Sequence, residues 1–81
     1  MSKPHVIIYS RPGCHLCDEA RETLLRVRSE APFELLEIDI ERDDELFKRY
    51  LERIPVVELG DQRVELVVSV GKLRRLLNQW A

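Results

Sequence analysis

The fold of this chain is decided by the stretch HVIIYSRPGCHLCDEA, residues 5–20. Its first part, residues 5–9, contains an unbroken apolar run, which predicts a strand buried on both faces. Residues 10–13 break that strand. Residues 14–29 carry apolar side chains at helical spacing with charged side chains between them, which predicts an amphipathic helix. The apolar positions of this helix are Leu16, Ala20, Leu24 and Val27.

Pro32 ends the helical stretch, and strand and helix patterns then alternate again. Residues 33–38 have the apolar content of a second strand, and residues 39–44 form an acidic turn. A helix is predicted to begin at Glu41 or Asp43, because acidic side chains favour the positive end of a helix dipole. Its expected inward face consists of Leu46, Phe47, Tyr50 and Leu51.

The remaining residues predict a hairpin and a last helix. Residues 56–59 and 63–68 are strand-like runs around a tight turn at residues 60–62, so they should pair in antiparallel fashion. Ser69 can cap a final helix whose apolar face is Leu73, Leu76, Leu77 and Trp80. The order β-α-β-α-β-β-α predicts an α/β fold, with a four-stranded mixed sheet and helices on both faces.

Length and composition restrict the class of protein. The 81 residues suit a single domain spanning 1–81, and 44% hydrophobic with 35% charged residues is a globular composition. A formal net charge of −2 argues against nucleic acid as a partner. The apolar run near the N-terminus is too short for a signal peptide or a membrane span. We therefore expect a cytoplasmic protein that does not bind membranes, and a monomer.

The two cysteines, Cys14 and Cys17, point to chemistry rather than to architecture. A disulfide between them closes a very small loop and would stabilise the fold little. Cys14 falls at the start of a helix, where the positive dipole end stabilises a thiolate, and Arg11 or a protonated His15 could add to that effect. Cys17 lies one turn further along the same face. The prediction is that Cys14 attacks a disulfide and Cys17 resolves the mixed disulfide.

Other interpretations of the same residues are simpler. A structural zinc ion needs four ligands, and Cys14, Cys17, His15 and the distant His5 are a poor set, so no metal site is expected. His15 is equally well explained as a solvent-exposed residue. Asp39 is more simply a cap or turn residue than a group that influences protons near the thiols. The aromatic residues Phe47, Tyr50 and Trp80 are expected in the core.

The segment YSRPGCHLCDEA at residues 9–20, followed by RIPVV at residues 53–57, resembles the thioredoxin-like superfamily. More narrowly, the chain is similar to compact bacterial glutaredoxin-like proteins. The resemblance implies a thiol-disulfide oxidoreductase with Cys14 and Cys17 as catalytic residues. It also implies a cis-proline at Pro55 beside the disulfide, with Ile54 offering backbone groups to a substrate. The expected substrate-binding residues are Arg11, Pro12, His15, Ile54 and Pro55.

The resemblance implies no bound metal or organic cofactor, and an electron carrier that reduces protein or mixed disulfides. Glutathione is one candidate reductant or co-substrate, and a flavoprotein disulfide reductase is the other candidate electron source. Where glutathione-using relatives carry an aromatic residue and a glycine pair, this chain has Leu16 and residues 68–71. The alternatives to an enzyme are a binding module that lacks catalysis, or a dimer that holds an iron-sulfur cluster through Cys14.

Overall fold

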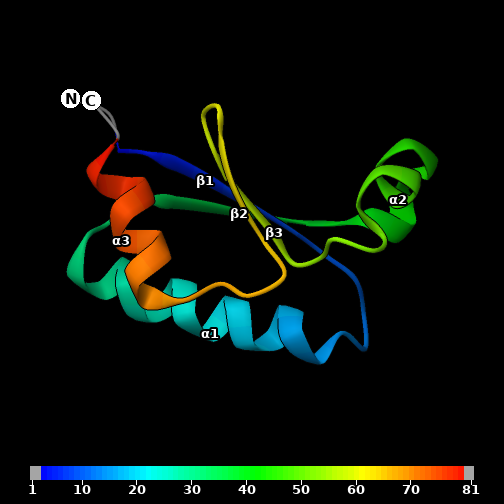
Figure 1. Cartoon of the computed structure of the whole chain (residues 1–81), viewed down its shortest axis with the longest axis horizontal. Helices are drawn as coiled ribbons and strands as arrows, with labels where there is room; N and C mark the ends of the chain where they lie inside the picture. Colours follow the sequence, from blue (N-terminus) through cyan, green and yellow to red (C-terminus); the bar gives the residue numbers. More distant parts are fainter. Residues whose placement is uncertain (1–2, 80–81) are drawn as a thin grey trace.

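The computed structural model describes residues 3–79 and confirms the predicted order of elements. A short 3₁₀ helix, η1, occupies part of the predicted acidic turn. The elements are, in order, β1 (His5–Ser10), α1 (His15–Glu30), β2 (Glu34–Asp39), η1 (Ile40–Arg42), α2 (Asp44–Tyr50), β3 (Val56–Leu59), β4 (Gln62–Glu65) and α3 (Val70–Asn78) (Figure 1).

The four strands form one mixed sheet in the order β2-β1-β3-β4. Strand β1 pairs in parallel with β2 and antiparallel with β3, and β3 and β4 form the predicted antiparallel hairpin. Strand β1 is one of the two central strands of the sheet. The chain therefore leaves β1 at the middle of the sheet, on the side where the C-terminal end of β1 lies. The turn that carries the cysteines therefore begins at that point.

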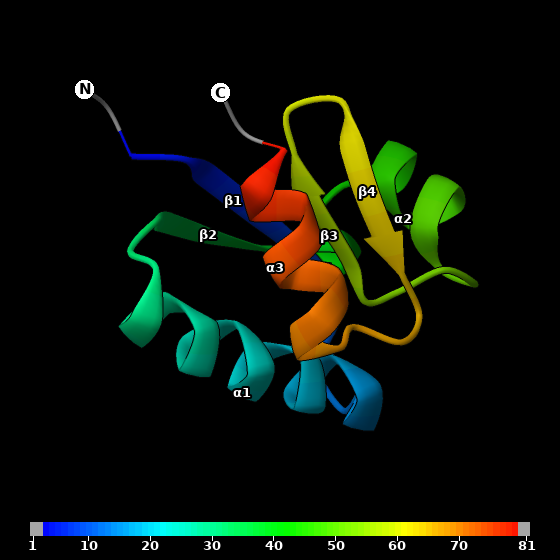
Figure 2. The ribbon, with the colours of Figure 1, turned by 60° about the vertical axis from the view of Figure 1, so that its left-hand side comes forward.

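Helices cover both faces of the sheet, as predicted. Figure 2 shows α1 and α3 on one side and α2 on the other. Side chains of β1 alternate between these faces, as a pleated strand requires. Val6 and Ile8 pack into the cluster beneath α1 and α3, whereas Tyr9 packs with Tyr50 of α2. The prediction that β1 is buried on both faces holds for Val6, Ile8 and Tyr9, while Ile7 is half-buried.

The prediction for the first turn of α1 was wrong in one position. Leu16 is 45% exposed, and Cys17 occupies the buried position instead. The buried face of α1 consists of Cys17, Ala20, Leu24 and Val27. These four residues form a single stripe along the helix. Cys17 can belong to this stripe because a cysteine packs as a small hydrophobic residue. Cys17 is thus part of the face through which α1 packs on the sheet.

The predicted last strand, residues 63–68, is shorter than expected. Strand β4 ends at Glu65, and the next residue, Leu66, has a positive φ of 65°. The Leu66 N–H donates to the carbonyl oxygens of Pro55, at 2.9 Å, and of Arg53, at 3.3 Å. The chain therefore leaves the sheet next to the segment that enters β3. This loop exposes Leu66 and Val67 to solvent.

The remaining differences are local. Leu51, expected on the inward face of α2, is exposed because α2 ends at Tyr50. Ile40 of η1 is fully buried, and the Asp39 carboxylate caps η1 by accepting the N–H of Glu41 at 2.9 Å. The predicted core role of Trp80 falls outside the described residues. Among residues 3–79, no helix combines the length and apolar character that a membrane span requires.

Candidate active site

The turn from β1 into α1 places Cys14 at the N-cap of the helix. Gly13 has a positive φ of 77°, which glycine adopts without a side-chain clash, and the chain can turn sharply there. The Cys14 Sγ accepts the backbone N–H of Cys17 at 3.1 Å, as a capping oxygen would. The sulfur of Cys14 therefore lies where unpaired N–H groups and the helix dipole favour negative charge.

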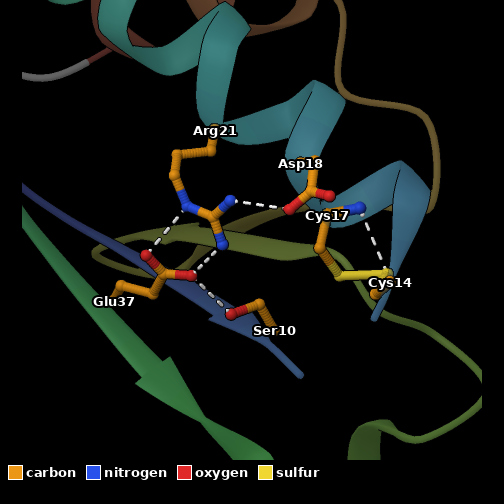
Figure 3. Close-up of a disulfide and its surroundings, with 6 residues drawn as sticks. All are labelled: Ser10, Cys14, Cys17, Asp18, Arg21 and Glu37. Carbon is orange, nitrogen blue, oxygen red and sulfur yellow. Dashed lines mark hydrogen bonds and ion pairs between the residues drawn. A yellow bond between two sulfur atoms is a disulfide. The ribbon is translucent and has the colours of Figure 1, made fainter. Parts of the chain in front are cut away.

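Cys14 and Cys17 form a disulfide, and their Cα atoms are 5.2 Å apart. Figure 3 shows this disulfide at the start of α1. The two residues differ in exposure, since Cys17 is fully buried while Cys14 is partly accessible. An approaching thiol or disulfide can reach the sulfur of Cys14 but meets packed side chains before that of Cys17. This geometry supports redox chemistry at the pair and distinguishes the two sulfurs.

The floor of the site is an aromatic and aliphatic cluster on the α2 side of the sheet. Cys17 packs there with Ile54 and with Tyr9, whose ring centroid lies 4.7 Å from that of Tyr50. Burial, together with the nearby Glu58 carboxylate, raises the pKa of Tyr9. The phenol therefore stays neutral near pH 7, and the floor beneath the disulfide is apolar on this side.

The predicted proline, Pro55, lies between Ile54 and Val56, which both belong to this cluster. The Ile54–Pro55 peptide bond is cis, as the resemblance implies, and Pro55 is fully buried. The N–H of Ile54 donates to the carbonyl oxygen of Tyr50 at 3.0 Å. Because this N–H already has an acceptor within the protein, the carbonyl oxygen is the backbone group of Ile54 that we expect to contact a substrate.

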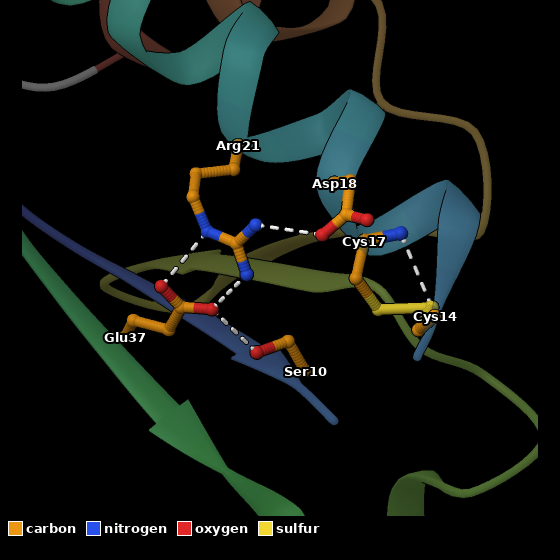
Figure 4. A network of polar contacts seen from close by, with 6 residues as sticks. All are labelled: Ser10, Cys14, Cys17, Asp18, Arg21 and Glu37. Carbon is orange, nitrogen blue, oxygen red and sulfur yellow. Dashed lines mark hydrogen bonds and ion pairs between the residues drawn. A yellow bond between two sulfur atoms is a disulfide. The ribbon is translucent and has the colours of Figure 1, made fainter. Parts of the chain in front are cut away.

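A polar network lies on the opposite side of the disulfide, between α1 and β2 (Figure 4). We call Ser10, Asp18, Arg21 and Glu37 the Glu37 clamp. The Arg21 guanidinium binds both oxygens of Glu37, through Nε at 2.9 Å and through Nη2, and also binds Asp18 at 2.8 Å. The buried Ser10 hydroxyl donates to Glu37 at 2.8 Å. Glu37 thus ties the end of β1 to the second turn of α1, so both ends of the cysteine loop are anchored.

The clamp shifts the ionisation of its members. The hydrogen bond from Arg21, with a smaller contribution from Ser10, holds the pKa of Glu37 below its ordinary value, although partial burial opposes the shift. The bonds to Glu37 and Asp18 raise the pKa of Arg21 further above its already high value. Both groups are charged throughout the neutral range.

This shift predicts a pH-dependent contribution to stability. The folded-state pKa of Glu37 lies below the ordinary value of 4.5, so its contribution is present above that pH and is lost as the pH falls through the folded-state value. We expect Glu37→Gln to be less stable than the wild type at pH 7, with the difference shrinking on acidification. Urea unfolding at a series of pH values measures it, and a difference that stays constant on acidification contradicts the assignment.

Two basic residues that adjoin predicted site positions, Arg11 and Arg53, have acidic partners. Arg11, expected to stabilise the thiolate, pairs with Glu41 at 2.8 Å and lies over the ring of Phe47, 5.8 Å from its centroid. Arg53 pairs with Glu65 at 3.6 Å. The positive charge of Arg11 is thus largely balanced by a neighbour, which reduces the effect expected of it on Cys14.

The other two predicted substrate-binding residues, Pro12 and His15, are both exposed on the rim of the site. The His15 Nε2 lies 3.7 Å from the Glu19 carboxylate one turn away on α1. Among residues 3–79, no group of three or more His, Cys, Asp or Glu side chains is arranged to hold a metal ion.

The sequence reasoning missed the Glu37 clamp and the loop at Leu66 and Val67. A cleft of about 340 Å³ beside the cysteine loop is lined by Ser10, Arg11, Pro12, Gly13, Asp18, Arg21, Glu37 and Asp39. The alternation along β2 carried a signal for the clamp, because Glu37 is opposite Ile8 in the β1–β2 register and so faces α1. A charged residue on that face requires a partner, and Arg21 lies on the facing helix.

Comparison with known proteins agrees with this geometry. The glutaredoxin-like domain (DUF836) family model matches residues 5–78, whereas no curated protein sequence matches. The X-ray structure of protein XcR50 from X. campestris is similar, with a TM-score of 0.81 and 27% identity over 94% of this chain and 99% of that one. Protein Ne2328 from Nitrosomonas europaea gives a TM-score of 0.81 and 26% identity over 95% and 94%. A glutaredoxin from Brucella melitensis gives a TM-score of 0.58 and 28% identity over 99% and 85%.

With this fold, and with its cysteine pair at the start of α1, the chain belongs to the glutaredoxin-like (DUF836) family of the thioredoxin-like superfamily.

Proposed function

We propose that this protein is a thiol-disulfide oxidoreductase that carries two electrons to disulfides in other proteins. The observation that carries the proposal is the unequal cysteine pair at a helix N-terminus. Cys14 is the accessible N-cap residue, and Cys17 is buried one turn further along the helix. This is the arrangement that an attacking and a resolving thiol require.

The reaction begins from the dithiol form. The Cys14 thiolate attacks one sulfur of the substrate disulfide, which forms a mixed disulfide and releases one substrate thiolate. Cys17, after losing its proton, attacks the Cys14 sulfur and releases the second substrate thiolate. The substrate gains two electrons and the protein ends as the Cys14–Cys17 disulfide. An external thiol donor, either glutathione or a flavoprotein disulfide reductase, returns it to the dithiol.

The surface around Cys14 favours a polypeptide substrate. Leu16, Leu66 and Val67, which we call the apolar rim, are 45%, 47% and 61% exposed. Leu66 is joined to Pro55 by a backbone hydrogen bond, and the loop after β4 passes beside the first turn of α1 in both ribbon views (Figures 1 and 2). Apolar side chains exposed beside a reactive sulfur fit an apolar segment of a protein better than the charged tripeptide glutathione.

The position of the rim is held by its own loop. The Val67 N–H donates to the Glu65 carbonyl oxygen at 2.8 Å, and Lys72 Nζ donates to the Val67 carbonyl oxygen at 3.1 Å. Val68 anchors the loop in the core beneath α3. Leu66 and Val67 are therefore presented by a constrained backbone, which reduces the entropy cost of binding a substrate.

The test compares a protein disulfide with a small disulfide. We expect the doubly substituted Leu66→Ser, Val67→Ser protein to lose about tenfold in kcat/KM for reduction of insulin, but less than about twofold for hydroxyethyl disulfide. Dithiothreitol serves as the electron source so that only the substrate side is measured. Leu36→Ser is the matched control, since Leu36 is exposed on β2, away from the apolar rim.

Equal losses on both substrates would show that the rim affects the cysteines rather than the protein substrate. Failure of the wild type to reduce either disulfide would overturn the proposed function itself. A second assay supplies electrons from glutathione with glutathione reductase, or from thioredoxin reductase, each coupled to NADPH. We expect the reductase to be the better donor, because the apolar rim lacks groups that bind a charged tripeptide.

A further inference from the structure

The Glu37 clamp includes two charged residues of α1 that lie close to Cys17 along the helix. Asp18 follows Cys17 directly, and Arg21 lies one turn beyond it on the same helix. In both close-up views Ser10 lies between Glu37 and the disulfide (Figures 3 and 4). Two carboxylates and one guanidinium leave the clamp with a formal charge of −1. The net charge of the Glu37 clamp can therefore affect the equilibrium between the dithiol and disulfide forms of the cysteine pair.

The other charges around the pair are paired with neighbours or face solvent. Arg11, on the cysteine loop, is matched by Glu41, and His15 lies beside Glu19 on the exposed side of α1. Asp39, at the end of β2, accepts a backbone N–H. Arg21 is thus the cation that offsets the carboxylates between α1 and β2, and its loss would leave Asp18 and Glu37 without a counter-charge.

We propose that the Glu37 clamp sets the redox balance of the cysteine pair, with Arg21 favouring the dithiol form and Glu37 favouring the disulfide. The reduced form carries a negative thiolate at Cys14, whereas the disulfide is neutral. A nearby positive charge stabilises only the reduced form, and a nearby negative charge destabilises only that form. These are positioning residues that act through the field at Cys14, and they do not touch the reacting sulfur.

The inference rests on the redox role of the pair but not on the choice of substrate. An electrostatic role of the clamp and a purely structural role predict different results for the single variants. If the clamp only holds α1 against β2, then removing either partner disturbs the cysteines in the same direction. If it acts by charge, removing Arg21 and removing Glu37 shift the equilibrium in opposite directions, and removing both nearly restores it.

The test is equilibration of each variant with reduced and oxidised glutathione at pH 7 and low salt, followed by quantification of dithiol and disulfide forms by alkylation and mass. We expect Arg21→Met to shift the equilibrium about threefold toward the disulfide and Glu37→Gln about threefold toward the dithiol. The double variant should lie within about 1.5-fold of the wild type. At 1 M salt both single shifts should shrink, because exposed charges are screened.

A matched pair of controls exists elsewhere on the molecule. Arg74 binds Glu30 at 2.6 Å, and Glu30 is the last residue of α1, at the end opposite the cysteines. Arg74→Met and Glu30→Gln make the same charge changes at the far end of α1. The rise per residue of an α-helix places Glu30 about 20 Å from the cysteine pair, so these variants should leave the redox equilibrium unchanged. Thermal unfolding of the oxidised proteins verifies that every variant is folded.

Shifts of Arg21→Met and Glu37→Gln in the same direction, or equal shifts in the control pair, overturn the inference. So does the absence of any shift. If the wild-type protein does not exchange with glutathione at all, the proposed redox function is overturned. This outcome can be told apart from failure of the inference about the clamp, because it is seen in the wild type without any variant.

Discussion

Cys14→Ser is expected to abolish disulfide reduction, with a loss of about a thousandfold or more in insulin reduction. A serine hydroxyl stays protonated near pH 7 even at a helix N-terminus, so the first attack cannot occur. Cys17 cannot replace it, because it is fully buried beneath the first turn of α1. Turnover with dithiothreitol measures the loss.

The matched variant is Cys17→Ser, which keeps the attacking thiol. It should complete the first step and then stop as a mixed disulfide, which mass spectrometry detects as an added substrate mass. If Cys14→Ser accumulates a mixed disulfide faster than Cys17→Ser does, the assigned roles of the two cysteines are reversed.

Leu24→Ala is expected to cost about 2–5 kcal/mol of unfolding free energy. Leu24 is 1% exposed and lies in the middle of the buried stripe of α1, where it packs into the cluster shared with β1, β3 and α3. Small domains have only about 5–15 kcal/mol of total stability, so the loss is a large fraction of it. Urea unfolding of the oxidised protein measures the change.

Leu25 provides a control of the same residue type at the next position of the same helix. Its side chain is 50% exposed, so Leu25→Ala should cost less than about 1 kcal/mol. Similar losses for the two variants would mean that α1 does not pack through the stripe described here.

Much of this fold could be predicted from short stretches of sequence. The apolar run in residues 5–9 predicted β1, and the helical stripe after it predicted α1, because each pattern reflects the burial of one local element. The errors came where a local pattern competes with distant contacts. Residues 66–68 have strand-like composition, yet the N–H of Leu66 bonds to carbonyl oxygens more than ten residues earlier, and the strand ends.

The candidate site also has some features that could be predicted from the sequence and others that could not. The spacing of Cys14 and Cys17 and their place at a helix start were visible in the sequence, and they predicted the disulfide that the structure contains. Their unequal burial was not visible, because it depends on how α1 lies on the sheet. The order of attack therefore stays a prediction, and the unequal exposures of the two cysteines are consistent with it.

By itself, then, the sequence determined the order of the elements, the redox-type pair and the proline at residue 55, since these follow from neighbours along the chain or from a motif. Only the tertiary structure decided the Glu37 clamp and the apolar rim. Ser10, Arg21 and Glu37 are separated by 11 and 16 residues, and only the parallel pairing of β1 with β2 and the packing of α1 bring them together. Periodicity along a strand can place Glu37 on one face of the sheet, but it does not identify the partners of a long-range contact, because each partner alone looks like an ordinary polar residue.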